Sequence, residues 1–412
     1  MSPIHTAPGL LLPQADKSWL TKYASNGRSL SAAMALMVLA ALLATLLPAC
    51  GGGVGTGGTG SYAEGTITGF GSVIVNGVRF DESAARIEDD DGAAQSSAAL
   101  RLGMTVQIDA GPLSSSGTDT VAQAHLLRVT RALVGPVAGL NLPGGRFSVL
   151  GQPVEVGVDT VFDERLPNAL AGLAGGTRVE VYAVFDALSG SYHASRVALA
   201  ASGAANKVAG PVTQIDTSAR TLRIGGQSYS FAALGTLAGL AEGALLRLGL
   251  PGTTDAQGRW IIAGQSAADP LPAEAAQLEL RGLVQAQSSA TRFTVEGRPV
   301  DTASARIDGV ITPGAQVKVS GVLRAGVVQA SRVTVENSGS PQELEVGGPI
   351  TAVDAANRRF VVRNTSISYA RADVEFSGGT AAQLAQGRKV TVKGQLSADR
   401  SVLDALKIKF EN

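Results

Sequence analysis

The chain has 412 residues, of which 34 are basic and 34 acidic, and it contains one cysteine and three histidines. A single cysteine excludes both an intrachain disulfide framework and a cysteine-rich zinc site, and the balanced charge argues against a strongly basic nucleic-acid-binding protein. With 45% hydrophobic residues, the chain is also too apolar to be disordered along its length.

The first 50 residues have the pattern of an export signal. Three basic residues, Lys17, Lys22 and Arg28, precede an uncharged apolar stretch at residues 31–47. A basic region followed by such a stretch is typical of a secretory signal or a short membrane anchor. We therefore expect residues 1–49 to act as a signal peptide that directs the chain into the cell envelope.

The apolar stretch ends at the only cysteine. The residues at this point, Leu47, Pro48, Ala49 and Cys50, resemble the lipobox that lipoprotein signal peptidase cleaves. The resemblance implies cleavage before Cys50, a diacylglycerol on its sulfur and, because Gly51 follows, an outer-membrane location facing the periplasm. Residues 50–61 would then hold the lipid and a flexible, glycine-rich tether. The alternative is an unmodified cysteine in an uncleaved helix.

Two short motifs recur along the rest of the chain with a common period. An opening motif, glycine with valine or isoleucine two positions later, occurs at residues 65–67, 135–137, 210–212, 282–284 and 348–350. A second motif, glycine followed by alternating apolar residues, occurs at residues 103–108, 176–181, 243–248, 314–319 and 387–392. The two series predict five modules, numbered here one to five, at residues 62–132, 133–205, 206–275, 276–340 and 341–412.

Each module is expected to contain five strands. The opening strand leads into a hairpin, whose clearest turn is Asn76-Gly77. An irregular stretch rich in alanine and leucine follows, and then come the strand of the second motif and a final strand. Apolar and polar residues alternate in these strands, which predicts one buried and one solvated face.

This strand order is that of the OB-fold, a five-stranded Greek-key barrel. The sequence therefore predicts an all-β chain built as a tandem array of five small five-stranded OB-like barrels, with small open β-sandwiches as the alternative. Module three is the most divergent, because Arg259-Trp260 stands where modules two and four end in Ser-Arg-Val.

Several of these runs carry a family resemblance. Residues 65–80, with Leu102-Gly103-Met104 downstream, resemble the domain of unknown function 5666 found in proteobacterial lipoproteins, and residues 147–154 look like the same domain. The resemblance covers nearly all of residues 62–412. It implies an exported, tandemly repeated β protein, and it implies no activity and no catalytic residues.

Few residues offer catalytic or metal-binding chemistry. His125 and His193 lie near the last strands of two different modules, where ordinary strand residues are the simpler interpretation. One acidic run could supply oxygen ligands to Ca²⁺: Glu88, Asp89, Asp90 and Asp91. The alternating spacing of a calcium loop is absent, and adjacent side chains of an extended segment point apart. We therefore favour a solvated loop and expect neither a metal nor a cofactor.

Four basic residues occupy equivalent places in the last strands: Arg128, Arg196, Arg332 and Lys407. They could form a repeated basic row that touches an anionic glycan or lipid headgroup. We favour the alternative, in which each side chain is paired across the sheet with an acid such as Glu180, because such pairs are common and contribute only about 0.2–1 kcal/mol.

These observations lead to a functional hypothesis. We expect a non-enzymatic, lipid-anchored protein of the cell envelope, whose repeated modules act as a binding or structural array toward an envelope polysaccharide or protein. The main alternative is an envelope hydrolase with a site in one divergent module. A nucleic-acid-binding OB protein is a weaker alternative, because Trp260 would be the only tryptophan left after cleavage and no basic groove is evident.

Overall fold

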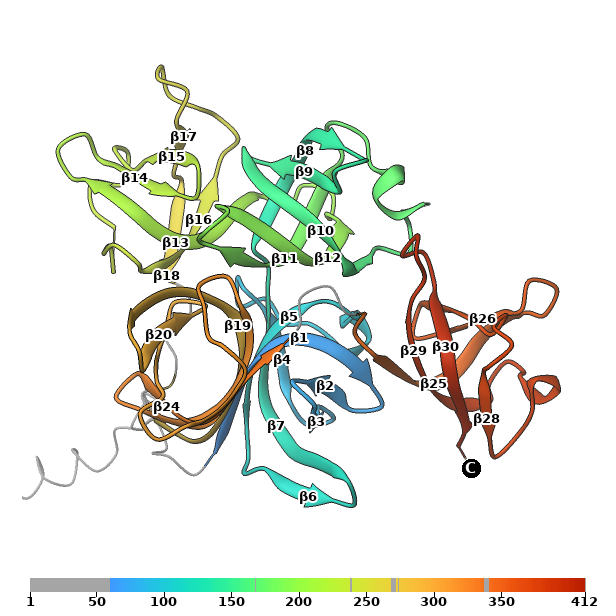
Figure 1. Cartoon of the computed structure of the whole chain (residues 1–412). Helices are drawn as coiled ribbons and strands as arrows, with labels where there is room; N and C mark the ends of the chain where they lie inside the picture. Colours follow the sequence, from blue (N-terminus) through green and yellow to red (C-terminus); the bar gives the residue numbers. More distant parts are fainter. Residues whose placement is uncertain are drawn as a thin grey trace, which may run out of the picture. The chain divides into compact units, whose positions relative to one another are not determined.

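The computed structural model describes residues 60–166, 168–237, 239–267, 272, 274–336 and 341–411, which belong to one compact unit spanning residues 57–412 (Figure 1). The predicted signal peptide and the lipobox residues Leu47, Pro48, Ala49 and Cys50 lie outside the described residues. Within the described part, no helix has the length and apolarity that crossing a membrane requires.

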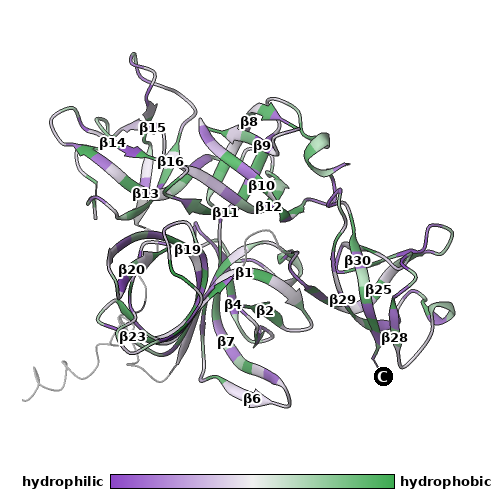
Figure 2. Ribbon diagram, viewed as in Figure 1, coloured by the Kyte–Doolittle hydropathy of each residue, from purple (hydrophilic) through white to green (hydrophobic). Residues whose placement is uncertain are grey.

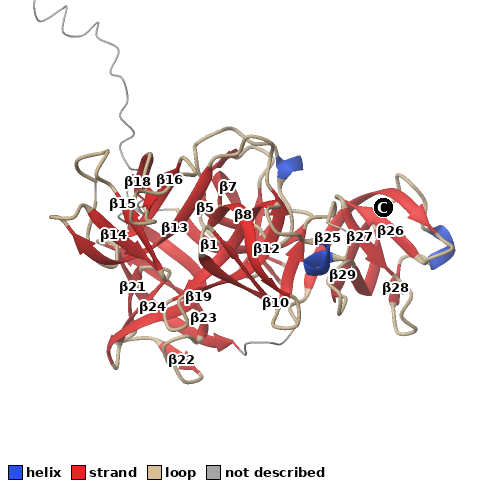
Figure 3. Cartoon of the chain, turned by 90° about the horizontal axis from the view of Figure 1, so that it is seen from above, coloured by secondary structure: helices blue, strands red, loops and turns tan. Residues whose placement is uncertain are grey.

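The all-β prediction is confirmed. The helical elements among the described residues are three one-turn 3-10 helices, at Ser97–Ala99, Ala169–Gly172 and Ala381–Gln383 (Figure 3). The last two fall in the alanine- and leucine-rich stretches that were expected between the third and fourth strands of a module.

The strands follow one another in a similar order in the five predicted modules. Module one holds β1 (Ser61–Phe70), β2 (Val73–Val75), β3 (Val78–Asp81), β4 (Arg86–Asp89), β5 (Thr105–Ala110), β6 (Ser114–Ser116) and β7 (Asp119–Thr130). Module two holds β8 (Leu133–Asn141), β9 (Arg146–Val149), β10 (Gln152–Phe162), β11 (Arg178–Asp186) and β12 (Ser191–Leu199). Module three holds β13 (Asn206–Asp216), β14 (Thr221–Ile224), β15 (Gln227–Ser230), β16 (Leu245–Leu250), β17 (Trp260–Ile261) and β18 (Gly264–Ala267).

The last two modules complete the series. Module four holds β19 (Glu274–Ser289), β20 (Arg292–Val295), β21 (Arg298–Asp301), β22 (Arg306–Asp308), β23 (Gln316–Arg324) and β24 (Val327–Glu336). Module five holds β25 (Leu344–Asp354), β26 (Arg359–Val362), β27 (Thr365–Ser368), β28 (Glu375–Ser377), β29 (Lys389–Leu396) and β30 (Leu403–Phe410). The short strands β4, β22 and β28 were not predicted, and they pair in parallel with β7, β24 and β30.

The two sequence motifs meet in every module. The amide of the second motif's glycine donates to the last residue of the opening motif at 2.7–2.9 Å: Gly103 to Ile67, Gly176 to Val137, Gly243 to Val212, Gly314 to Val284 and Gly387 to Ile350. In return, the last residue of the opening motif donates its amide to the carbonyl of the residue that follows the second motif's glycine. Each of these glycines has φ between 80° and 85°, where an L-residue costs roughly 1–2 kcal/mol. This geometry explains why glycine recurs at the second motif.

The ladders of two modules close into five-stranded barrels. In module two the pairs run from β8 to β9, β10, β12 and β11 and return to β8, with β10 and β12 parallel. Module four closes in the same order through β19, β20, β21, β24 and β23, and Figure 1 shows its barrel end-on. This order, with the third and fifth strands parallel, is that of an OB-type barrel.

The same succession of ladders recurs in modules one and five, as β1–β2–β3–β7–β5–β1 and β25–β26–β27–β30–β29–β25. In module three the last strand is broken, because β17 pairs with β15 and β18 pairs with β16. The break lies just after Arg259-Trp260, where the sequence departs from the other modules. These ladders differ from the open sandwiches that were the alternative prediction.

Hydrophobic and hydrophilic residues alternate along the strands (Figure 2). In β29, for example, Val390 and Val392 are fully buried, while Lys389 at the start of the strand is exposed. Burying such a side chain contributes about 1.5–3 kcal/mol. Three hydrophobic clusters result. The first combines residues of modules one and five with three residues of module two, the second combines modules two and three, and the third lies in module four with Tyr62 of module one.

Hydrogen bonds also run between modules. β1 pairs in parallel with β19 and, at its end, with β25, while β8 pairs with β13. Modules one, four and five therefore share a 19-stranded sheet, and modules two and three share an 11-stranded sheet. The expectation of a simple tandem array needs correction here, since the opening strands offer unpaired backbone groups that a neighbouring module satisfies.

Candidate functional site

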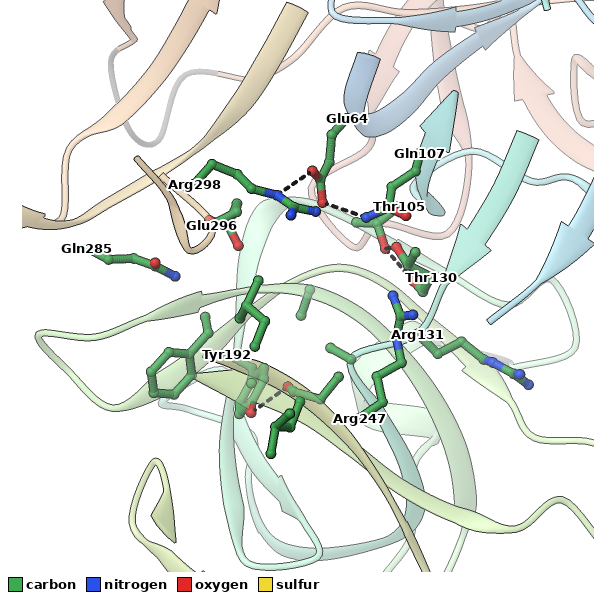
Figure 4. A pocket seen from close by; sticks show the side chains of 17 residues that line it. Glu64, Thr105, Gln107, Thr130, Arg131, Tyr192, Arg247, Gln285, Glu296 and Arg298 are labelled. Carbon is green, nitrogen blue, oxygen red and sulfur yellow. Dashed lines mark hydrogen bonds and ion pairs between the residues drawn. The ribbon is translucent and has the colours of Figure 1, made fainter. Parts of the chain in front are cut away.

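A polar cavity of about 90 Å³ lies where modules one to four meet (Figure 4). Module one supplies Glu64 and Gln107 from β1 and β5, and module four supplies Gln285, Glu296 and Arg298. Modules two and three close it with a further set that includes Tyr192 and Arg247. Polar side chains from four modules therefore converge in this cavity.

The hairpin of module four places Glu296 in the cavity. Glu296 lies in the turn between β20 and β21 with φ of 48°, the conformation that Asn76 adopts in the matching turn of module one, at 55°. Its side chain crosses the opening glycine of its module, since a Cβ added to Gly282 would come within 2.6 Å of the Glu296 Cγ. Gly65 leaves the same room for Asn76. The opening glycine therefore makes space for the turn residue.

Glu64 is the centre of the hydrogen-bond network. It accepts from the Nε2 of Gln107 at 3.1 Å, from the Nε of Arg298 at 3.3 Å and from the hydroxyl of Tyr62 at 3.3 Å. Figure 4 shows Gln107 and Arg298 converging on this carboxylate from different modules. The Glu64–Arg298 pair is mostly buried, so the two charges depend on each other for solvation.

Glu296 is held largely in its neutral form. Burial raises the pKa of Glu296 to about 8, and the charge of Glu64 adds to this effect, while the amide of Leu283 and the charge of Arg298 oppose it. Burial alone would lower the pKa of Arg298, but the charge and hydrogen bond of Glu64, together with Tyr62 and Glu296, outweigh burial and raise it. Near neutral pH the carboxyl group of Glu296 is therefore mostly protonated.

Two buried donors facing this cavity have no hydrogen-bond partner in the described structure. They are the Nε2 of Gln285, whose Oε1 accepts from the Gly297 amide at 2.6 Å, and the Nη2 of Arg298. Such groups cost about 1–3 kcal/mol each unless water satisfies them. At about 30 Å³ per molecule, the cavity volume corresponds to about three waters. The arrangement can therefore bind water between modules and hold a proton on Glu296.

The predicted acidic run joins modules instead of standing free in solvent. Arg131, at the junction of modules one and two, donates from Nε to Asp90 at 2.7 Å, and its Nη2 also contacts Asp89 and Asp91. Its Nη1 reaches Glu180 of module two at 3.2 Å. Lys207 of module three contacts Asp91 and lies 3.6 Å from Asp90. The preference for a solvated loop was wrong for Asp90, whose side chain is 0% exposed.

The three aspartates lie close enough together to offer a metal site. Burial by itself would raise the pKa of Asp91, but the hydrogen bond and charge of Lys207, together with Arg131, hold it below its usual range. Two cationic side chains already occupy the space between these carboxylates. Glu88 is directed elsewhere, to Arg86 and Arg128 at 2.9 and 2.5 Å.

The four residues of the predicted basic row are each paired with an acid. Arg128 pairs with Glu88, Arg332 with Asp308 at 2.6 Å and Lys407 with Glu375 at 2.7 Å, and each acid lies on one of the short strands β4, β22 and β28. Arg196 is only 2% exposed, and it contacts Glu164 at 3.2 Å and the carbonyl of Leu102 in module one. The four basic residues are therefore paired with acids, as expected, but Glu180 pairs with Arg131 and not with one of these four.

The two histidines lie outside the cavity lining. His125 is exposed on β7. His193 on β12 is 46% exposed, with its Nε2 3.6 Å from Asp186 and 3.8 Å from Glu155. Ser189 donates to Asp186 at 2.6 Å and not to the histidine. A nucleophile activated by a histidine would need the serine and the histidine to be bonded to each other.

Sequence reasoning missed the residues of the cavity. Glu64, Gln107, Glu296 and Arg298 come from strands and a turn whose spatial meeting depends on how modules pair. One signal was available: Glu296 stands before Gly297 in a hairpin turn where module two has Leu150. A charged residue at a turn position that packs over the opening glycine indicates a polar environment.

Comparison with known families supports the repeats. Residues 134–198, 281–334 and 347–409 match the family described as Domain of unknown function (DUF5666). These segments fall in modules two, four and five. The chain therefore carries DUF5666 repeats in three segments. No curated protein matches the chain.

Proposed function

We propose that the chain is an exported, non-enzymatic protein of the cell envelope, anchored by lipid on Cys50 and built from five OB-type barrels that act together as a structural or binding array. The two motifs bond to each other in all five modules, which supports five related barrels even where a ladder is interrupted. The three DUF5666 segments support the same division.

The observation that carries this proposal is the use of polar side chains at the junctions. Arg131 joins three aspartates of module one to Glu180 of module two, and Arg298 of module four pairs with Glu64 of module one. Charged groups that are desolvated at such junctions hold neighbouring modules in a fixed register. This arrangement suits a rigid array more than a chain of independent binding units.

An envelope hydrolase is the second candidate, and one feature favours it. Glu296, with its raised pKa, lines the same cavity as Glu64, and paired carboxyl groups serve as acid and base in glycoside hydrolysis. Against it stands the volume: a cavity for about three waters has no room for a sugar ring. The aromatic residues that line the cavity, Phe185 and Tyr192, are buried and packed against each other, so they offer no open surface on which a nucleic-acid base could stack.

Lipid attachment is tested with Cys50→Ser. Cells expressing the natural chain and the variant are labelled with a radioactive fatty acid and fractionated. We expect label and membrane association for the natural chain and neither for the variant, since stable anchoring takes about two acyl chains. Equal mass and equal membrane association of the two proteins would refute the anchor.

The structural role is tested against hydrolysis with Glu64→Gln and Glu296→Gln. If the cavity is structural, neither change alters turnover of cell-wall or polysaccharide substrates, while Glu64→Gln lowers the melting temperature. Substrate turnover by the natural protein that either substitution abolishes would establish the hydrolase instead.

A further inference from the structure

The lysines of the protein are concentrated on one face of module five. The described residues contain six lysines, and four of them lie on the neighbouring strands β29 and β30: Lys389, Lys393, Lys407 and Lys409. Apart from Lys207 and Lys318, the basic residues of modules one to four are arginines. Module five has ten basic and eight acidic residues, whereas residues 62–340 have 21 basic and 25 acidic. Positive charge is therefore localised to this module.

The register places all four side chains on the solvent face of the barrel. Thr391 pairs with Lys409 and Lys393 with Lys407, while the alternate pairs, Val390 with Phe410 and Val392 with Ile408, are buried. Lys393 and Lys407 thus lie directly opposite each other across the ladder. Like charges in that position are destabilising, so barrel stability does not account for their placement.

A groove of about 730 Å³ runs beside this face, between modules one and five. Its cationic lining consists of Lys389, Lys393, Lys409, Arg79 and Arg363, against three acidic residues. Gly347 forms part of the floor, where a Cβ would come within 3.2 Å of the Thr391 Oγ1. The groove is thus open, polar and net positive.

The lysines are held loosely in the present structure. Lys393, Lys407 and Lys409 each contact a partly exposed glutamate, at 3.3, 2.7 and 3.3 Å, and such surface pairs contribute only about 0–1 kcal/mol. Lys393 also lies 3.7 Å from the largely buried Glu345, whose two oxygens already bond Arg79. Lys389 has no acidic partner among the described residues. These side chains can therefore turn toward an external anion at little cost.

We propose that the outer face of β29 and β30, with the adjoining groove, docks on the phosphate headgroups of an anionic lipid membrane. A single small anion would be expected to engage the planar fork of an arginine. The fork of Arg79 is already used, because it bonds both oxygens of Glu345 at 2.8 and 2.9 Å and Asp119 at 2.8 Å. Flexible lysine side chains that are spread over the face of a sheet can instead each contact a different phosphate of a surface that carries many phosphates. The proposal does not require the lipid on Cys50.

The test uses the full chain carrying Cys50→Ser, so that no acyl chain contributes. Co-sedimentation is measured with vesicles of phosphatidylcholine alone and with phosphatidylcholine containing phosphatidylglycerol, at low and high salt. Each lysine near an anionic surface is worth about fivefold in affinity, so Lys389→Gln with Lys409→Gln should weaken binding to the anionic vesicles about 25-fold. Binding to neutral vesicles, which reports the apolar stretch at residues 31–47, should be unchanged.

The matched control removes two exposed charges elsewhere, with Arg86→Gln and Arg306→Gln, whose side chains are 69% and 74% exposed. We expect this control to bind like the parent chain. Equal losses in the two double variants, or binding that ignores phosphatidylglycerol and salt, would overturn the proposal. Binding to a soluble anionic polysaccharide without vesicle binding would also overturn it. Salt titration of the parent chain decides the point even if a variant is unstable.

Discussion

Replacing Glu296 by glutamine should remove a pH dependence from the stability of the protein. The folded pKa of Glu296 is about 8 against an ordinary value of 4.5. The folded state therefore binds more protons than the unfolded state between these two pH values. The stabilising contribution of the protonated carboxyl is complete below about pH 4.5 and is lost as the pH rises through about 8.

The magnitude follows from the shift. A pKa unit corresponds to about 1.4 kcal/mol, so a fully sealed carboxyl would lose about 5 kcal/mol across the shift from 4.5 to about 8. Glu296 is half-buried and faces the cavity, so we expect only about 1–2 kcal/mol. Glutamine keeps the shape and accepts the same bond from the Leu283 amide without ionising.

The assay compares melting temperatures from about pH 5 to about pH 9. The natural protein should lose several degrees relative to Glu296→Gln over this interval. The protection of the Leu283 amide, taken as its exchange rate relative to the intrinsic rate at each pH, should fall with pH only in the natural protein. Glu242→Gln, at an exposed carboxylate, serves as the control and should follow the natural protein. Parallel curves for the natural protein and Glu296→Gln would refute the reasoning.

Other predictions concern the junctions and the motifs. Arg131→Met leaves Asp90 buried without its main partner and should lower the free energy of unfolding in denaturant by about 3–5 kcal/mol. A loss below about 1 kcal/mol would contradict a structural role for the ion pairs of Arg131. Because cations already occupy the aspartate cluster, millimolar Ca²⁺ should leave the melting temperature unchanged, and a rise would restore the metal site. Gly387→Ala, at φ of 83° with open space for a Cβ, should cost about 1–2 kcal/mol. Gly175→Ala, with the same space and no positive φ, should be neutral, and equal effects of the two would contradict the backbone explanation.

The sequence was sufficient to predict the five main strands of a module, though not the short strands β4, β22 and β28, because the modules repeat local rules. Asn76-Gly77 gives a hairpin turn, and the glycine of the second motif gives a left-handed residue before a strand. These features depend on neighbours in the chain, and five copies made each one easier to recognise. The alternation of buried valine with polar residues then placed the core.

The candidate site could not be predicted in the same way. Glu64 meets Arg298 across 234 positions of sequence, and nothing in either local pattern indicates that β1 pairs in parallel with β19. The acidic run was interpreted as solvated because its partners are distant in the sequence: Arg131 lies 41 positions after Asp90, and Lys207 belongs to module three. Pairing between modules depends on free strand edges, and the period of the repeat does not encode which edges meet.

The pairing of β1 with later strands sets an order of events during synthesis. Module one is synthesised before the other modules, yet the free edge of its strand β1 is paired only by β19 and β25. The side chain of Asn76 likewise donates to the carbonyl of Glu279, which lies 203 positions later. Contacts of such long sequence separation form slowly. Until they form, the exposed edge of β1 can pair with another chain, since edges of this kind seed aggregation. This edge therefore stays available to other chains until β19 and β25 are made, and a chain truncated before module four should expose it permanently.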